Sequence, residues 1–148
     1  MPGNRAIYDR AMDQSREAAR QKQWDAALKG AVRAVQEFPQ DTDARTATAV
    51  ALFHTDKLSK ALQIFEELRA AHPDNPFFLG YIARAQERQG NTTAAVESYQ
   101  QLIELHEHQR VTARVIEALR DVLRLRPELD DQRQRLAHLL EDVNATRE

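Results

Sequence analysis

The chain has 148 residues, of which 42% are hydrophobic and 30% are charged, and this composition favours a folded domain over a disordered chain. Its 21 basic and 23 acidic residues give a net charge of −2, without the basic excess that nucleic-acid-binding proteins usually carry. Cysteine is absent, which excludes disulfides, a thiol nucleophile and a cysteine-ligated zinc site.

The 4 Gly and 5 Pro residues supply too few turns for an all-β fold, whereas long stretches of Ala, Leu, Glu, Gln and Arg favour helix. The sequence therefore predicts an all-α protein. In chain order, the hydrophobic periodicity predicts helices at about 4–21, 24–38, 42–54, 58–71, 75–89, 92–107, 109–125 and 128–145.

The hydrophobic residues do not form a membrane-crossing or secretory segment. No stretch reaches the roughly 18 apolar residues of a membrane helix. Charges are scattered through residues 1–24, where a secretory signal would need a continuous apolar core. We therefore expect no membrane insertion and a cytoplasmic location.

A period of 34 residues runs through the chain. Pro39 and Pro73, which each close an apolar-periodic segment, are 34 residues apart. Small and large residues recur with the same spacing, at Ser15, Ala49 and Ala83, at Ala27, Ala61 and Ala95, at Ala31, Phe65 and Tyr99, and at Ala34, Leu68 and Leu102. A fixed period of this length predicts stacked pairs of helices.

The small residues have a physical role in such a pair. They are expected where the first helix crosses the second, because a large side chain would hold the two axes more than about 8–10 Å apart. The larger residues four and seven positions after each second-helix alanine share its face, and they are expected to pack against the next pair. Pro39 and Pro73 then end their helices, because proline has no N–H group and clashes with the preceding turn.

Three segments carry this pattern, QWDAALKGAVRAVQEFP, KLSKALQIFEELRAAHP and NTTAAVESYQQLIELHE, and on them the chain resembles the tetratricopeptide repeat family. The resemblance implies a right-handed α-α solenoid in one domain, residues 1–148, with repeats at about 8–39, 42–73 and 76–107. We interpret residues 109–145 as a degenerate fourth repeat or as capping helices. Leu129 and Leu136 keep the 34-residue spacing from Ala95 and Leu102.

No motif for catalysis or metal binding is present. The sequence lacks an HExxH pair, a Gly-rich phosphate loop and a nucleophile elbow. His106 and His108 flank Glu107, but residues two apart on a helix point to different sides, so both are expected at the surface or at a helix end. We therefore expect no enzyme activity, no metal and no cofactor.

In the tetratricopeptide repeat family the first helix of each repeat lines a concave surface where partner peptides lie. The resemblance therefore implies a partner-binding groove formed by Met12, Arg16, Val50, Phe53, His54, Phe77, Tyr81, Arg84 and Arg88. Its apolar centre with arginines at the edge suits an amphipathic helix or an extended peptide that carries acidic residues. In an alternative interpretation, Phe53 and Phe77 only pack between repeats.

One subset of the family binds the C-terminal carboxylates of chaperones with two Lys, two Asn and one Arg. The matching positions in this chain are Met12, Arg16, Ala47, Phe77 and Tyr81. This mode of binding is therefore not expected.

The resulting hypothesis is a non-catalytic scaffold or adaptor that binds a protein or peptide partner. The alternative is a self-assembling structural protein that forms homo-oligomers through its groove or its C-terminal helices. Binding to RNA through the helical repeats is disfavoured by the balanced charge.

Overall fold

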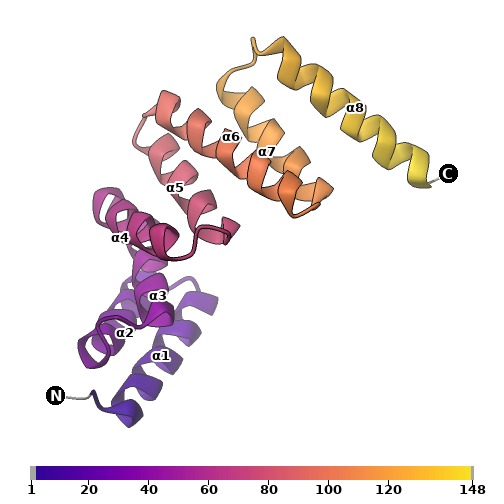
Figure 1. Cartoon of the computed structure of the whole chain (residues 1–148). Helices are drawn as coiled ribbons and strands as arrows, with labels where there is room; N and C mark the ends of the chain where they lie inside the picture. Colours follow the sequence, from indigo (N-terminus) through magenta and orange to yellow (C-terminus); the bar gives the residue numbers. More distant parts are fainter. Residues whose placement is uncertain (1–2, 148) are drawn as a thin grey trace. The chain divides into compact units, whose positions relative to one another are not determined.

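The computed structural model describes residues 3–147, and over that range it contains eight α-helices and no strand (Figure 1). The helices are α1 (Arg5–Arg20), α2 (Trp24–Glu37), α3 (Thr42–His54), α4 (Leu58–Ala71), α5 (Pro76–Arg88), α6 (Thr92–His108), α7 (Thr112–Leu125) and α8 (Asp130–Arg147). The prediction of an all-α fold is confirmed, and the helix ends lie within a few residues of the predicted ones.

The helices gather into two compact units, and the single repeat domain over residues 1–148 stays a prediction. The first unit, Met1–Ala71, contains α1 to α4, and the second, His72–Glu148, contains α5 to α8. Within each unit, consecutive helices pack against one another and are joined by short turns.

The crossing of α1 and α2 confirms the role predicted for the small residues. Ser15 is buried, and its hydroxyl donates a hydrogen bond of 2.8 Å to the Ala27 carbonyl on the partner helix. Gly30 lies at the closest approach, where a Cβ atom would stand 2.8 Å from the Ala11 carbonyl oxygen. The two backbones touch there, so a glycine is required by packing.

The same crossings recur in the other helix pairs. Ala49 and Ala61 in the first unit, and Ala83 and Ala95 in the second, are fully buried. These positions were predicted from the 34-residue period, and the prediction is confirmed. Small side chains let the helices approach closely, and the larger neighbours then fill the core.

Side chains at the helix N-termini fix where the helices begin. The Asn4, Asp41, Asn75 and Asn91 side chains each accept a hydrogen bond from a free backbone N–H of the first turn. Asp41 also accepts from the Tyr8 hydroxyl at 2.5 Å, which ties α1 to the start of α3. Burial of the tyrosine and this carboxylate raise the pKa of Tyr8 to about 12.

The core of the second unit lies between α5, α6 and α7. Leu79 and Ala83 from α5 meet Tyr99 and Ile103 from α6, and Leu119 of α7 is fully buried among them. The helix α8 contributes no fully buried side chain. It packs on this core through the half-buried Leu136 and Leu139, together with Leu129 directly before the helix.

Four turns between helices share one backbone geometry. Each contains a residue with positive φ, at Lys22, Asp56, Gly90 and Arg110. In each turn the next residue donates its N–H group to a carbonyl five residues earlier, as Val111 does to His106 at 2.9 Å. The first three turns join the two helices of a repeat. The fourth joins α6 to α7, so α7 follows α6 as a second helix follows a first.

The turn from α7 to α8 matches the turn between one repeat and the next. Phe38 ends α2 with φ −134° and ψ 85°, and Arg126 ends α7 with φ −136° and ψ 74°. A proline follows each of them, at Pro39 and Pro127. The helix α7 therefore ends as a second helix does, and α8 begins as the first helix of a further repeat.

This geometry corrects the register expected after residue 108. Leu129 and Leu136 stand 34 residues after Ala95 and Leu102, but α8 is not a second helix and these leucines are not equivalent to those core positions. The true equivalents lie in α7 and directly after it, 54 positions after the residues that they match. Val115, Leu119, Val122 and Pro127 correspond to Ala61, Phe65, Leu68 and Pro73. The repeat is therefore offset by 20 residues, with α6 serving as the second helix of one pair and the first helix of the next.

His106 lies in the last turn of α6, which agrees with the expectation of a helix-end histidine, but it is buried, with 8% of its surface exposed. It lies near Arg114 and Glu117 of α7, and its Nδ1 atom has no hydrogen-bond partner among residues 3–147. Burial lowers the pKa of His106 below its ordinary value. Arg114 lowers it further, and Glu117 opposes this effect. The neutral ring is therefore the form that the fold holds.

Acidification is expected to destabilise the chain through His106. The unfolded chain takes up a proton near the ordinary pKa of 6.5, whereas the folded chain takes it up only at lower pH. The stability that the neutral ring contributes is therefore complete above the ordinary pKa and is lost as pH falls toward the folded pKa. Between about pH 7 and pH 5, the Tm of the parent should fall further than that of His106→Leu. Parallel pH profiles of the two proteins would contradict this.

Candidate functional site

The predicted groove residues of the first unit divide into buried and exposed groups. Met12 is 2% exposed, among Tyr8, Ala11 and Ala34, and Phe53 is 6% exposed. Neither side chain offers a surface to a partner, because neighbouring residues already cover it. We therefore remove Met12 and Phe53 from the candidate surface.

Arg16, Val50 and His54 keep accessible surface. Arg16 is exposed on α1 and lies 4.0 Å from Asp13, and Val50 is half-buried on α3. The His54 ring stacks on the Trp24 ring, with centroids 3.9 Å apart and planes at 11°. Trp24 thus holds the histidine at the end of α3, a contact between helices that the sequence did not indicate.

The predicted residues of the second unit form one continuous surface on α5. Phe77, Tyr81, Arg84 and Arg88 stand at intervals of four, three and four residues, which places them along one side of the helix. With Gly80 between them, we name this surface the α5 strip. Phe77 is 45% exposed, an unusually large apolar surface for this chain, and the two arginines are also exposed.

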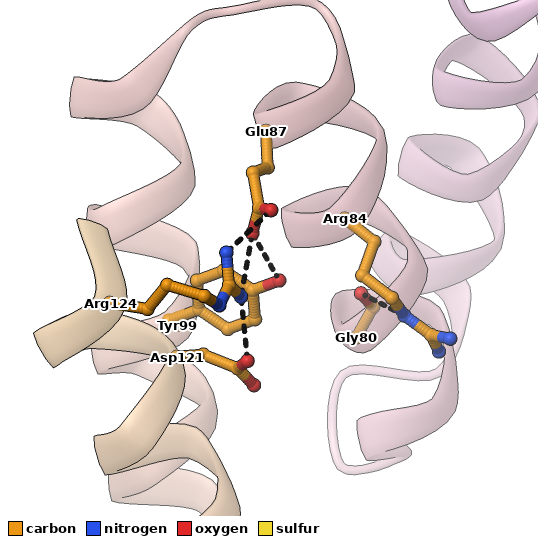
Figure 2. A network of polar contacts seen from close by, with 6 residues as sticks. All are labelled: Gly80, Arg84, Glu87, Tyr99, Asp121 and Arg124. Atoms are coloured by element: carbon orange, nitrogen blue, oxygen red, sulfur yellow. Dashed lines mark hydrogen bonds and ion pairs between the residues drawn. The ribbon is translucent and has the colours of Figure 1, made fainter.

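Ring contacts hold the α5 strip in place. The Phe77 and Tyr81 rings lie 5.2 Å apart, and the Arg84 guanidinium carbon lies 4.3 Å from the centre of the Tyr81 ring. The Arg84 Nε atom donates to the Gly80 carbonyl oxygen at 3.3 Å (Figure 2). All these contacts stay within α5, so within residues 3–147 the charge of Arg84 is not paired with a carboxylate.

Gly80 leaves an opening in the middle of the strip. A Cβ atom placed there would meet only the tip of Arg84, at 3.8 Å, in contrast to the backbone clash at Gly30. Packing therefore does not require this glycine, although glycine inside a helix costs about 0.5–1 kcal/mol relative to alanine. A small side chain at this position would therefore fit without displacing the rest of α5.

A polar network on another side of α5 fixes the helix that carries the strip. Glu87 accepts two hydrogen bonds from Arg124 of α7, at 2.6 and 3.0 Å, and one from the Tyr99 hydroxyl of α6, at 3.1 Å. Arg124 also donates to Asp121 at 2.7 Å. Figure 2 shows these groups pointing toward one another while Arg84 points away from them. Three helices are thereby joined through one carboxylate.

The charges of this network reinforce one another. The hydrogen bonds from Arg124 hold the pKa of Glu87 below its ordinary value, and burial raises the pKa of Tyr99. At neutral pH Glu87 is therefore ionised and Tyr99 is a neutral donor, the combination that the hydrogen bonds require. These hydrogen bonds hold α5, the helix that carries the strip, against α6 and α7.

Sequence reasoning found the residues of the α5 strip but missed this network. Tyr99 was recognised only as a large residue of the repeat. A buried tyrosine needs a partner for its hydroxyl, and this was the available signal. That partner, Glu87, lies 12 residues before Tyr99 and 37 residues before Arg124. The 34-residue period indicates neither of these spacings.

The described residues contain neither a metal-binding cluster nor a membrane-spanning helix. Among residues 3–147 there is no group of three or more His, Asp or Glu side chains placed to hold a metal ion. None of the helices that the structure describes is long and apolar enough to cross a membrane.

Comparison with protein families identifies the repeats. One family model described as tetratricopeptide repeat matches residues 18–77, and a second with the same description matches residues 81–108. Together the two matches cover more than half of the chain. No curated protein sequence is significantly similar to it.

Solved structures with the same fold include domains from yeast, plants and bacteria. The TPR2B domain of yeast Sti1, solved in a complex with pHsp70, has a TM-score of 0.71 at 15% identity and covers 83% of this chain and 98% of that one. The Arabidopsis OM64 TPR domain has a TM-score of 0.67 at 16% identity, covering 82% and 96%. MamA from Desulfovibrio magneticus RS-1 has a TM-score of 0.56 at 14% identity, covering 93% and 86%. At these identities the similarity establishes the fold alone.

Proposed function

This chain belongs to the tetratricopeptide repeat family, whose fold is generally a scaffold for protein–protein interaction, and we propose that its α5 strip binds a peptide or helix of a partner protein. The strip combines an exposed aromatic ring, an opening at Gly80 and an arginine without a carboxylate partner among the described residues. The exposed Arg84, held over Tyr81 and without a carboxylate partner among residues 3–147, is the observation that carries the proposal.

The chemistry of the strip sets the kind of segment that it accepts. An apolar side chain of the partner would pack on Phe77 and Tyr81, and an acidic side chain would pair with Arg84. Arg84 is already held over the Tyr81 ring, so little side-chain entropy is lost when a carboxylate binds it. The partner segment therefore carries an apolar residue close to an Asp or Glu.

The scaffold is proposed to be non-catalytic. The family is typically composed of interaction scaffolds, and the strip offers stacking and charge pairing without a nucleophile or a general base. The partner chemistry differs from the chaperone carboxylate clamp, because Phe77 and Tyr81 occupy two of the clamp positions. The pHsp70 partner of the yeast domain is therefore not transferred to this chain.

Selection of a random peptide library displayed on phage, against the full chain, tests the proposal. The enriched peptides should combine aromatic or aliphatic residues with Asp or Glu. Tyr81→Ala and Arg84→Ala should each weaken binding of a selected synthetic peptide by about tenfold or more, because each removes one of the two anchors. Both variants should stay close to the parental Tm, since Arg84 is exposed, Tyr81 is only half-buried and neither belongs to the core.

Arg5→Ala is the matched control for Arg84→Ala. Arg5 is exposed on α1, and its guanidinium carbon lies 4.6 Å from the Tyr8 ring centre, the same kind of stacking as Arg84 on Tyr81. This variant should bind the peptide like the parent. Peptides that bind the parent, Tyr81→Ala and Arg84→Ala equally well would exclude the strip as the binding site.

A further inference from the structure

The helix α8 has the position of a first helix in a repeat, and among residues 3–147 only α7 is seen to pack against it. It follows Pro127 as α3 follows Pro39, and Ala137 lies at the position of Ala49 and Ala83 in the earlier first helices. Ala49 and Ala83 are fully buried, and α4 and α6 pack on the helices that carry them. Ala137 is exposed.

One side of α8 is already occupied. Leu129, Leu136 and Leu139 pack on the core of the second unit, beside α7. By helical spacing Ala137 and Leu140 lie on the adjoining side, and α7 is the helix of this unit that packs on α8. Leu140 is half-buried there. The surface has the shape that this fold uses for close contact between helices, a small residue at the crossing with a larger one beside it.

The charges around Ala137 are self-complementary. Arg133 lies four residues before it and Glu141 four residues after it, and both are exposed on the same side of the helix. If a second α8 crosses antiparallel at Ala137, each Arg133 faces the other chain's Glu141, twice by symmetry. Asp130 and Asn144, seven residues to either side of Ala137, face one another in the same way.

We propose that α8 docks against α8 of a second copy of this chain, in an antiparallel, two-fold symmetric contact centred on Ala137. Each copy supplies the helix that packs at Ala137 of the other. The two-fold arrangement explains why opposite charges stand at equal distances from the small residue, because an interface between identical copies must be complementary to itself. The Arg133 side chain leaves its exposed pair with Asp130, a contact within one helix that contributes little.

Light scattering of the full chain after size exclusion, over about 1 µM to 1 mM, tests this inference. The parent should pass from monomer to dimer as its concentration rises. Ala137→Glu should abolish the dimer, because a long charged side chain holds the helices apart. Arg133→Glu and Glu141→Arg should each weaken it by more than about tenfold, since each places like charges opposite one another at both ends.

The double variant Arg133→Glu with Glu141→Arg restores both pairs with the charges exchanged, so it should recover the parental dimer. Asp142→Arg is the matched control for Glu141→Arg. It reverses the next charge along α8, on the side away from Ala137, and should leave the dimer unchanged. A parent that stays monomeric at about 1 mM overturns the inference. So does a dimer that tolerates Ala137→Glu, or a double variant as weak as the single ones, because the contact would then be formed elsewhere.

Discussion

Replacing Leu119 with alanine is expected to lower the free energy of unfolding by about 2–5 kcal/mol. Leu119 is fully buried at the centre of α7, among Tyr99, Ile103 and Leu102 of α6. Removing its side chain loses the burial of the apolar carbons and leaves a cavity that rigid neighbouring helices fill only in part. Urea unfolding of the full chain, followed by circular dichroism, measures the loss.

Val111→Ala is the control for this prediction. Val111 lies in the same unit, directly before α7, and is one of the exposed large hydrophobic residues. Its truncation should change stability by less than about 0.5 kcal/mol. Equal losses from the two variants would show that the repeat offset does not place Leu119 in the core.

Replacing Gly30 with alanine is expected to destabilise the chain by about 1–3 kcal/mol. The added Cβ would stand 2.8 Å from the Ala11 carbonyl oxygen and 2.9 Å from the Ser15 nitrogen, both backbone atoms that cannot rotate away. The helices α1 and α2 must separate to admit it, and this weakens the hydrogen bond between the Ser15 hydroxyl and the Ala27 carbonyl. Thermal or urea unfolding measures the effect.

Gly80→Ala is the opposite case and serves as the comparison. A Cβ atom fits at Gly80 without a clash, and alanine favours helix over glycine by about 0.5–1 kcal/mol. Gly80→Ala should therefore raise the stability that Gly30→Ala lowers. If both substitutions change the free energy of unfolding in the same direction, the close approach of α1 and α2 is not as described.

The helix pairs of the first three repeats could be predicted from the sequence because crossing helices demand small residues. Ser15, Ala49 and Ala83 recur at a fixed spacing, and no other residue size fits a close crossing. The offset at α6 could not be predicted in the same way. Leucines are frequent in every helix, so Leu129 and Leu136 matched the 34-residue spacing without occupying the equivalent positions.

The turn that causes the offset gives no clear signal in the sequence. Arg110 adopts positive φ without being glycine, as Lys22 and Asp56 also do. Glycine marks such a turn only at Gly90. The hydrogen bond from Val111 to His106 that defines the turn is formed by backbone atoms, which are the same for every residue type.

The sequence predicted which residues share one side of α5, but it did not predict which groove residues of α1 and α3 are buried. Helical periodicity identifies residues that share a side of one helix, and this was sufficient for Phe77, Tyr81 and Arg84. It does not identify which neighbouring helix covers that side. Met12 and Phe53 share the expected side of their helices but are covered, so their burial depends on packing that no local pattern encodes.

Amide hydrogen exchange of the full chain, with and without a peptide selected from the library, tests the central claim most directly. The α5 strip is proposed as the binding surface, so the bound peptide should slow exchange most in the segment from Pro76 to Arg88. The Arg84→Ala chain, mixed with the same peptide, should lose this protection. Protection confined to α8, or absent from α5 at saturating peptide, would contradict the account and place partner binding elsewhere on the chain.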